Sequence, residues 1–498
     1  MLYNSPTFLF YFLPVVLITY LVIGKRLRNP FLLVASLVFY IWGEPILAPI
    51  ILLSIGVNFL LGKWIDLWRE NSTKTRRILA IAIVFNISIL VFFKIYSAYA
   101  VELTNIFHFS LPALPLQSMK RVNYLPLGIS FYTFAVISYI LDIHKGRSNS
   151  EPRLSRFALY ILLFPKVIAG PIERYSEIAA QLVDRVIETK CLSDGARRFI
   201  IGFSKKVLIA DTLAPVADQI FTLKISDLTT SMAWLGILCY TIQIYFDFSG
   251  YTDMAIGLGK MLGFKFVENF NHPYISKSIT EFWQRWHISL SRWFRDYVFF
   301  PLERRNHQRK SALVNNPGGV DFAQCSNILL VFLLTGLWHG VTPQYIIWGL
   351  LHGSAISLEV SCYGSWLKST WKLFQHIYAL TIIMTGWVFF RASTLQNALG
   401  YLKSLAGFSQ GSGLLPFSTK PIMDTHTWLA LMLGIMLSVP VVPTIISQTG
   451  ILMGELSQAP VLYWYMSIMR DILLLGIFLV SIMVMFGTTY HPYIYFRF

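Results

Sequence analysis

The stretch FAQCSNILLVFLLTGLWHGVTPQYIIWGLLHGSAISL, residues 322–358, contains no Asp, Glu, Lys or Arg. A single α-helix of these 37 residues would be roughly 55 Å long, nearly twice the thickness of a bilayer's hydrocarbon core. The stretch must therefore break, and Gly336, Gly340 and Pro343 are the residues at which we expect the break. His339 lies among them, so the sequence predicts a histidine between two helical pieces inside a membrane.

The composition of the whole chain agrees with a membrane location. The chain has 498 residues, of which 55% are hydrophobic and 13% charged, and its mean hydropathy is +0.57. Soluble proteins carry roughly 25% charged residues. We interpret the chain as one polytopic membrane domain over residues 1–498, with the first apolar run kept as a span because no signal-peptide features accompany it. The predicted spans are residues 8–24, 30–42, 45–61, 78–93, 124–143, 234–248, 328–338, 345–356, 377–390, 428–446 and 472–486.

The net charge of +16 comes from short basic clusters between the apolar runs, and these clusters predict the orientation of the chain. By the positive-inside rule they face the cytoplasm and contact the lipid bilayer, which places the N-terminus outside the cell membrane. Residues 30–61 lie between two such clusters, so we expect a tight hairpin there. Because the clusters are split among loops, nucleic acid is not an expected partner.

Several familiar kinds of site are not expected. The four cysteines are scattered without a CxxC pair, which argues against a zinc site or a disulfide framework, and no metal site is predicted. The sequence contains no P-loop and no GxGxxG motif, so a nucleotide-driven pump is not expected. The segment LLFPKVIAGPIERY, residues 162–175, cannot be one helix because of Pro165, Gly170 and Pro171. We expect it to lie on the membrane surface or to enter the membrane and return, buried by protein.

His339 has two interpretations. An isolated histidine in a membrane span can simply bridge two helices through a hydrogen bond. It can also act as a general base, because an imidazole with a pKa near ~6.5 stays neutral in an apolar site and can accept a proton from a hydroxyl. For His352, thirteen residues further on, a role in helix packing is the expectation.

A second feature is FWQRWHISLSRWFRDYVFFPL, residues 282–302. Its aromatic residues, together with Arg285, Arg292 and Arg295, predict one amphipathic helix with a basic edge at the membrane interface. The arginines could attract the phosphates of an acyl donor. His287 within this segment could act in catalysis or could only shape a pocket.

Two acidic residues occur in the apolar segment IYFDFSGYTDMAIGLGKMLG, residues 244–263. Asp247 and Asp253 are candidates for function because charged groups inside membranes are costly. A helix cap or a structural salt bridge is an equal alternative for each. Asp253 is placed well for an N-cap of a helix beginning at MAIGLG.

The motifs GPIERY, YFDFSGYTDMAIGLGKMLG, NFNHPYISKSITEFWQRWHISLSRWFRDYVFFPL, LTGLWHG and the terminal YIYFRF together resemble the membrane-bound O-acyltransferase family, most closely its alginate-type branch. The resemblance covers most of the chain, in the same order. It implies an all-α polytopic ring of about 9–12 transmembrane helices, with reentrant segments around a central tunnel. It also implies that His339 is the catalytic residue and that His287 matches the family's second histidine.

The same resemblance implies the substrates and partners. An acyl group from a cytoplasmic donor, expected to be acetyl-CoA with no bound cofactor, crosses the membrane. A separate extracytoplasmic acetyltransferase then passes the acetyl group to a polysaccharide. The chain departs from the alginate-type pattern after RDYVFFPL, where ERRNHQRK (residues 303–310) replaces a Gly-rich turn at a cytoplasmic loop. This basic insert would also suit an acidic carrier protein, so D-alanyl transfer from a carrier to teichoic acid stays open.

We therefore predict a membrane-embedded O-acyltransferase of the bacterial cytoplasmic membrane. His339 is its predicted general base, with His287 as the second catalytic candidate. A transporter or flippase is a weaker alternative, because the spans offer few relay groups besides Asp247, Asp253 and Lys94, and no inverted repeat is visible. The residues predicted to line the substrate tunnel or to bind the donor are Trp283, Arg285, Trp286, Arg295, Asp296, Trp338 and Asp247.

Overall fold

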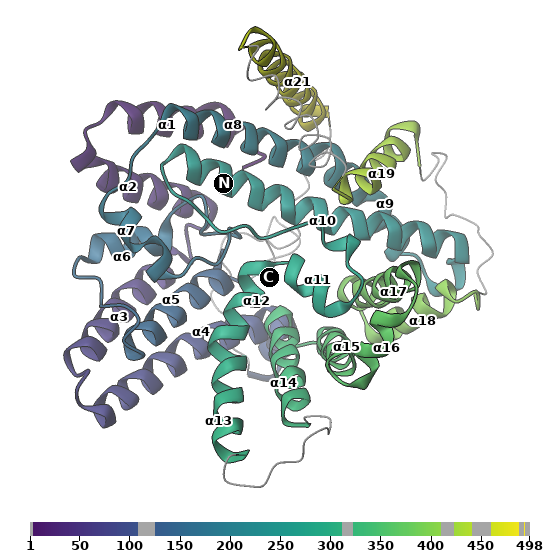
Figure 1. Ribbon diagram of the computed structural model, residues 1–498, viewed down its shortest axis with the longest axis horizontal. Coiled ribbons are helices and arrows are strands. Elements are labelled where there is room, and N and C mark those ends of the chain that lie inside the picture. Colours follow the sequence, from purple (N-terminus) through teal and green to yellow (C-terminus); the bar gives the residue numbers. More distant parts are fainter. Residues whose placement is uncertain are drawn as a thin grey trace.

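The computed structural model describes residues 3–107, 125–310, 322–409, 423–440, 460–487 and 493. The regular secondary structure within these ranges is helical, and the ranges contain no β-strand, which confirms the predicted all-α class. Figure 1 shows the helices arranged around a long central helix, α10. Of the terminal YIYFRF motif only Tyr493 is described, and the predicted span at residues 428–446 is described only as far as residue 440.

The N-terminal helices form the left part of the molecule in Figure 1. The predicted tight hairpin at residues 30–61 is wrong, because α2 packs mainly against α6, and α3 packs mainly against α4 and α5. These elements are η1 (Phe8–Phe12), α1 (Leu13–Val22), α2 (Lys25–Gly43), α3 (Ala48–Leu67), α4 (Ser72–Phe107), α5 (Ile129–His144), α6 (Leu154–Leu162) and α7 (Tyr175–Val183).

The segment between α6 and α7 has the irregular backbone that its sequence predicts. It contains no helix from Leu163 to Arg174, and its residues are buried along most of its length. Non-helical backbone at membrane depth is tolerated when protein covers it. The segment is covered in this way: the carbonyl of Phe164 accepts a hydrogen bond from Tyr3, and the amide of Ile172 donates one to Ser289.

The centre of the molecule is α10, which is longer than the span predicted at residues 234–248. Glycines allow α8 to lie directly against it: a Cβ at Gly202 would come 2.5 Å from the carbonyl oxygen of Gly250, and one at Gly257 would come 2.6 Å from that of Gly195. Small residues permit close helix packing inside membranes. These elements are α8 (Thr189–Ser204), η2 (Lys205–Ala210), α9 (Asp211–Phe221), η3 (Ile225–Asp227) and α10 (Thr230–Met261).

Most of the remaining helices pack below and to the right of α10 in Figure 1, with α19 above its right-hand part and α21 projecting at the top. The basic insert at residues 303–310 is the end of α13 rather than a loop. These elements are η4 (Pro273–Ile275), α11 (Ile279–Arg285), α12 (Ile288–Phe294), η5 (Arg295–Phe299), α13 (Phe300–Lys310), α14 (Phe322–His339), α15 (Pro343–Val360), α16 (Cys362–Ser369), α17 (Lys372–Arg391), α18 (Leu395–Leu405), α19 (Thr425–Ser438) and α21 (Pro460–Gly487).

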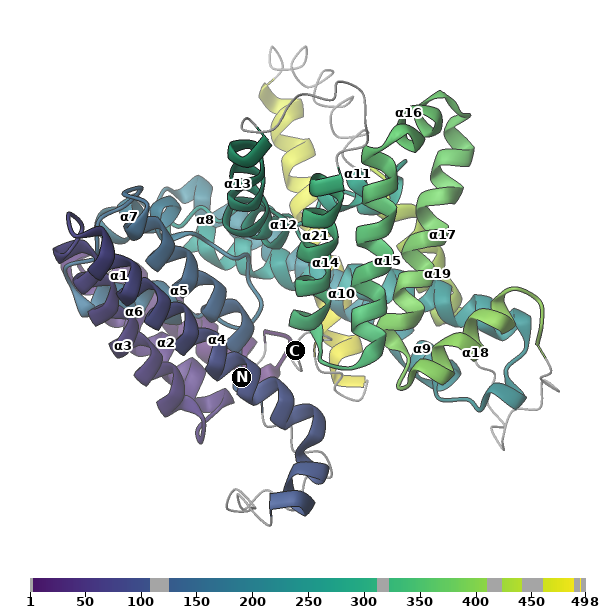
Figure 2. The ribbon, with the colours of Figure 1, turned by 90° about the horizontal axis from the view of Figure 1, so that it is seen from below.

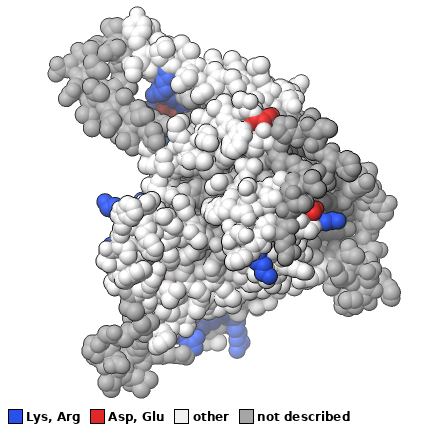
Figure 3. All heavy atoms as spheres, turned by 90° about the vertical axis from the view of Figure 1, so that its right-hand side faces the viewer, with Lys and Arg blue, Asp and Glu red and all other residues white. Residues whose placement is uncertain are grey.

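Five of the described helices are long and apolar enough to cross a membrane, and three shorter apolar helices accompany them. The predicted polytopic class is therefore confirmed, while about 9–12 crossings stays a prediction. Figure 2 shows α14, α15 and α17 standing side by side, at a steep angle to α10. Figure 3 shows the side of the molecule at the right of Figure 1, where the described surface carries few charged side chains, as expected of a surface in contact with lipid.

Candidate active site

The first element of the site is the break in the charge-free stretch, which lies at Gly340 and Pro343, two of the three residues at which the sequence predicts it, whereas Gly336 lies inside α14. Helix α14 ends at His339 and α15 begins at Pro343. The two helices cross closely because both carry glycine at the crossing. A Cβ at Gly336 would come 2.4 Å from the carbonyl oxygen of Tyr345, and one at Gly349 would come 2.3 Å from that of Phe332. The sequence therefore builds a tight helical hairpin with His339 at its tip.

The side chain of His339 lies in an aromatic environment and is 5% exposed. Its ring centroid is 4.5 Å from that of Trp338, 4.8 Å from Trp348 and 5.0 Å from Phe390. All three rings stand edge-on to the imidazole. Such surroundings exclude water and strengthen any polar contact that a substrate makes there.

A lysine from a distant helix meets the end of α14. The ammonium of Lys94, on α4, donates hydrogen bonds to the carbonyl oxygens of Trp338 and His339 and lies 5.5 Å from the Trp338 ring centroid. These carbonyls belong to the C-terminal end of α14, where the helix dipole favours a positive charge. Lys94 therefore ties the backbone that carries His339 to the N-terminal helices.

The second element of the site is a break that the sequence did not predict. The expectation of one amphipathic helix over residues 282–302 is wrong, because α11 ends at Arg285 and α12 begins only at Ile288. Between them Trp286 is extended and His287 has a φ of 43°. Residues other than glycine rarely adopt this left-handed conformation, and they do so mostly where tertiary contacts impose it. Here the contact is a backbone hydrogen bond from Ile288 to the carbonyl of Asn269.

The side chain of His287 is fully enclosed, with 1% exposure. Its Nδ1 lies 3.1 Å from Oδ1 of Asn269, and its ring is 4.7 Å from that of Phe248 and 6.5 Å from that of Trp338. The Trp338 ring therefore lies near both histidines, since its centroid is 4.5 Å from that of His339. Residues 287, 338 and 339, which the sequence predicts for the site, are brought together.

The two tryptophans of the second segment have different positions. Trp286 is buried against Phe282, Phe270 and Trp387. Trp283 donates a hydrogen bond from Nε1 to Nδ1 of His352, at 3.4 Å. His352 is fully buried and links α15 to α11, in agreement with its expected packing role.

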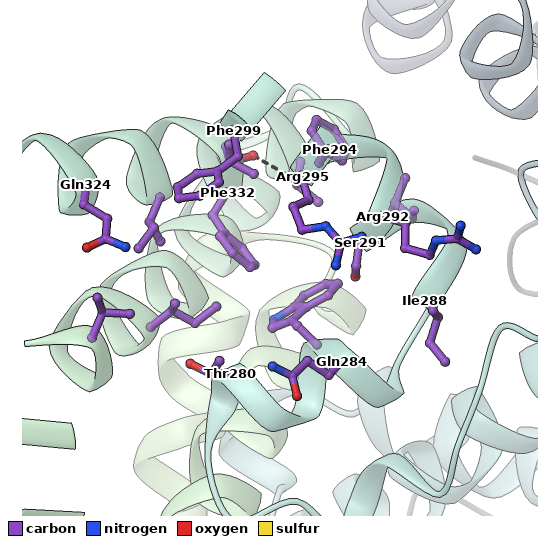
Figure 4. Close-up of a pocket in the computed structure, with 17 residues that line it drawn as sticks. Thr280, Gln284, Ile288, Ser291, Arg292, Phe294, Arg295, Phe299, Gln324 and Phe332 are labelled. Carbon is purple, nitrogen blue, oxygen red and sulfur yellow. Dashed lines mark hydrogen bonds between the residues drawn. The ribbon is translucent and has the colours of Figure 1, made fainter. Parts of the chain in front are cut away.

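A cavity of about 450 Å³ lies beside this centre. Figure 4 shows Arg295 pointing toward Ser291 among the lining side chains, whereas Arg292 points away. The lining does not include His287 or His339, and most of it is apolar. It consists of Thr280, Trp283, Gln284, Ile288, Leu290, Ser291, Arg292, Phe294, Arg295, Phe299, Gln324, Ile328, Val331, Phe332, Thr335, Ile356 and Val360.

Two of the remaining residues predicted for the site do not line this cavity. Arg285 pairs with Glu281 and donates to the carbonyl of Asn271. Asp296 pairs with Arg174 and Arg295 at the start of η5. Partial burial acts to raise the pKa of Asp296, but hydrogen bonds from Arg295 and Arg174 outweigh it, so that the pKa is lowered.

The two acids of α10 belong to structural ion pairs. Asp247 lies 2.6 Å from the ammonium of Lys206, which also pairs with Asp211 at 2.6 Å. Asp253 pairs with Arg198 and Lys205. The possible N-cap role of Asp253 is wrong, because Asp253 lies inside α10 rather than at its start, and the alternative of a salt bridge is confirmed.

Sequence reasoning missed Asn269 and Trp348 and noted Lys94 only as a possible relay. Asn269 lies in an irregular segment, and nothing in its local pattern distinguishes it from a turn residue. Trp348 occurs nine residues after His339 on the next helix, where a tryptophan is ordinary. The lone charge of Lys94 in an apolar span was a usable signal, since charges at such positions point into the protein.

The fold and the site together define an integral membrane enzyme with a dry, histidine-containing centre. Comparison with known proteins gives the class. Residues 144–393 match the family described as MBOAT, membrane-bound O-acyltransferase family. The chain is 41% identical over 398 residues to the "Probable alginate O-acetylase AlgI" of Azotobacter vinelandii, an alignment that covers 80% of this chain and 76% of that protein. The chain belongs to the membrane-bound O-acyltransferase family and is an O-acyltransferase of a bacterial membrane.

Two further relatives differ in the group or the polymer that their names specify. The "Peptidoglycan O-acetyltransferase" of Helicobacter pylori is 34% identical over 444 residues, covering 82% of this chain and 80% of that protein. The "Teichoic acid D-alanyltransferase" of Bacillus subtilis is 35% identical over 254 residues, covering 49% of this chain and 60% of that protein. Similarity to the two acetyl-transferring proteins therefore extends over much more of the chain.

Proposed function

We propose that this protein moves acetyl groups from cytoplasmic acetyl-CoA across the membrane for O-acetylation of an extracellular or cell-wall polysaccharide, with His339 as the general base. Support for acetyl over D-alanyl transfer comes from the longer alignments with the acetylases. A separate extracytoplasmic acetyltransferase would complete the delivery to the polymer. The basic clusters then face the cytoplasm and the N-terminus lies outside.

The observation that carries this proposal is the position of the cavity relative to His339. Thr335 lines the cavity, and His339 follows it by four residues on the same helix. Residues i and i+4 lie on one face of a helix, one turn apart. The part of the cavity wall formed by Thr335 therefore lies about one helical turn, roughly 5–6 Å, from the histidine.

The lining of the cavity suits an acyl thioester of coenzyme A. The apolar residues of α14 and α15 can surround the pantetheine arm and exclude water from the thioester. The guanidinium of Arg295 can bind a phosphate group through charge-assisted hydrogen bonds. Trp283 lines the cavity and would shape its wall around the acyl group, whereas Trp286 does not line it. The thioester carbon would then be presented toward His339.

In the proposed step, the acceptor hydroxyl oxygen attacks the thioester carbonyl carbon while its proton passes to the neutral imidazole of His339. The new C–O bond forms and the C–S bond breaks. The imidazolium then returns the proton to the leaving thiolate, so that an O-acetyl ester and free coenzyme A result. The aromatic rings around His339 keep water from hydrolysing the thioester.

D-alanyl transfer from a carrier protein is the second candidate, favoured by the teichoic acid relative and by the basic end of α13. Arg304 and Arg305 lie on that helix with exposed side chains and could contact an acidic carrier. The phosphopantetheine arm of a carrier has the same chemistry as that of coenzyme A. The same cavity could therefore accept it.

The test replaces His339 by Ala in the native host and measures the acyl esters that mild alkali releases from the cell envelope. We expect acetate to fall by about 10²–10⁴-fold, the range for loss of a general base. His376→Ala, on α17, is a matched control and should leave acetate unchanged at equal membrane abundance. Loss of D-alanine instead of acetate would support the carrier-dependent candidate. Unchanged esters would contradict the assignment of His339 as the base.

A further inference from the structure

Asn269 is fully buried beside His287, and its side-chain amide takes part in several hydrogen bonds. Its Oδ1 lies 3.1 Å from the backbone N of Ser289, 3.0 Å from the Ser289 hydroxyl and 3.1 Å from Nδ1 of His287. A backbone N–H can only donate, so the atom facing it must be the amide oxygen. The orientation of the Asn269 amide is thereby determined.

That orientation assigns the proton on the imidazole of His287. The carbonyl oxygen of Asn269 only accepts hydrogen bonds, so Nδ1 of His287 must carry the hydrogen that it donates. A neutral imidazole has one N–H and one lone pair. Nε2 of His287 therefore presents the lone pair.

This Nε2 atom is buried and has no hydrogen-bond partner among the residues that the structure describes. Leaving a buried polar atom unpaired is unfavourable, and natural proteins rarely do so without a functional reason. The backbone at the same residue is also strained, with a positive φ that the Asn269 segment holds in place. Two independent observations thus mark His287 as prepared for a group that arrives with the substrates.

We infer that His287 serves the acyl transfer as a hydrogen-bond acceptor at Nε2, for an O–H or N–H hydrogen that a substrate carries, and that Asn269 is the positioning residue that fixes this tautomer. The inference rests on the proposed function and adds a division of roles. His339 accepts the proton of the reacting hydroxyl, whereas His287 orients a substrate by accepting a hydrogen bond. In this tautomer the neutral ring of His287 cannot donate a hydrogen bond to the substrates.

Nitrogen NMR of the full-length protein, labelled with ¹⁵N-histidine and held in lipid nanodiscs, tests the tautomer directly. The signals of His287 are assigned as those that disappear in His287→Gln. We expect a protonated Nδ1 and an unprotonated Nε2 in the wild type, and a mixture of tautomers in Asn269→Leu. A protonated Nε2 in the wild type would overturn the inference, whatever the catalytic activity.

A matched pair of substitutions at residue 287 tests the role in transfer. The amide of His287→Asn can replace the Nδ1–H that bonds Asn269, but it removes the acceptor at the Nε2 position. The longer His287→Gln can place an oxygen near the Nε2 position and loses the bond to Asn269. We expect acetyl transfer to fall about 100-fold or more in His287→Asn and distinctly less in His287→Gln. The reverse order would mean that His287 is only a structural partner of Asn269.

Variants of Asn269 complete the test. Asn269→Asp keeps an oxygen acceptor and should retain most of the transfer, whereas Asn269→Leu should lose about 10–100-fold, as other residues that orient a reacting imidazole do. Asn86→Leu is the control for removing a buried asparagine, because Asn86 bonds Asn58 between α4 and α3. It should reduce stability without reducing the activity of the folded protein. Equal activity in Asn269→Leu and wild type would overturn the positioning role.

These measurements separate failure of the inference from failure of the proposed function. If His339→Ala stays active while His287 shows the expected tautomer and variant order, the base is misassigned but the acceptor role of His287 stands. If His339→Ala is inactive and His287→Asn is fully active, the proposed function stands and the inference fails.

Discussion

The break at His339 and the break at His287 both place a buried histidine where two helices meet, but they arise from different causes. Close after His339 come Gly340 and Pro343, residue types that favour the end of one helix and the start of the next. At His287 the neighbours are Trp286 and Ile288, which favour regular structure. There the interruption depends on hydrogen bonds to Asn269, from another part of the chain. One junction is encoded locally, and the other is imposed by the fold.

The two junctions also differ in the kind of group that holds them in place. At the local junction, the end of α14 accepts hydrogen bonds from a basic group of another helix, Lys94 of α4. The junction at His287 is held by neutral hydrogen bonds and ring contacts. Its continuation through α12 and η5 forms one wall of the cavity. The first junction carries the proposed base, and the second carries the proposed donor site.

Apart from replacement of the histidines themselves, the largest loss of activity at these two junctions is expected from Lys94→Met. Loss of the ammonium removes the hydrogen bonds to the carbonyls of Trp338 and His339. We expect acetyl transfer to fall about 10–100-fold, which corresponds to about 1–3 kcal/mol. The thermal unfolding midpoint should not fall, because Met fills similar space without a buried charge.

The measurement is acetyl transfer by purified protein in nanodiscs, together with thermal unfolding of the same samples. Lys63→Met, on α3, is the matched control, since the ammonium of Lys63 lies over the ring of Phe59. It should leave transfer unchanged. Full activity in Lys94→Met would show that the junction at His339 does not need its link to α4.

An effect on stability rather than on activity is expected from Gly336→Ala at the crossing of α14 and α15. The added Cβ would come 2.4 Å from the carbonyl oxygen of Tyr345, so the helices must separate. We expect the free energy of unfolding to fall by about 1–3 kcal/mol in a denaturation series from mild detergent into dodecyl sulfate. Gly476→Ala, on α21, has open space around the new Cβ and should be neutral or stabilising. An unchanged Gly336→Ala would contradict the close crossing.

The smallest effect is expected from a substitution in the cavity wall that follows the junction at His287. Arg295→Gln should raise KM for acetyl-CoA about tenfold with little change in kcat, because a charge-assisted hydrogen bond to the donor is lost. Arg292 pairs with Glu177 and points away from the cavity centre, so Arg292→Gln should change KM much less. Equal effects of the two substitutions on initial-rate kinetics would argue against a specific donor contact at Arg295.

Some interruptions of the helices could be predicted from the sequence, and others could not. The break around Gly340 and the irregular segment containing Pro165, Gly170 and Pro171 both follow from residues that cannot continue a helix. The uninterrupted helix predicted over residues 282–302 failed because its aromatic and basic pattern is compatible with a helix, and the pattern does not reveal the pairing with Asn269. Asp253 failed as a cap for a related reason, since α10 continues through it.

The sequence by itself determined the membrane location, the all-α class, the family and the histidine at the tip of a broken helix. These properties depend on apolar length, on glycine and proline, and on motifs that are contiguous in the chain. Three contacts appear only in the tertiary structure: Lys94 with the end of α14, Trp338 with His287, and Asn269 with His287. Each of these contacts joins residues distant in sequence, and their energies depend on burial and on hydrogen-bond geometry that exist only after the helices have packed.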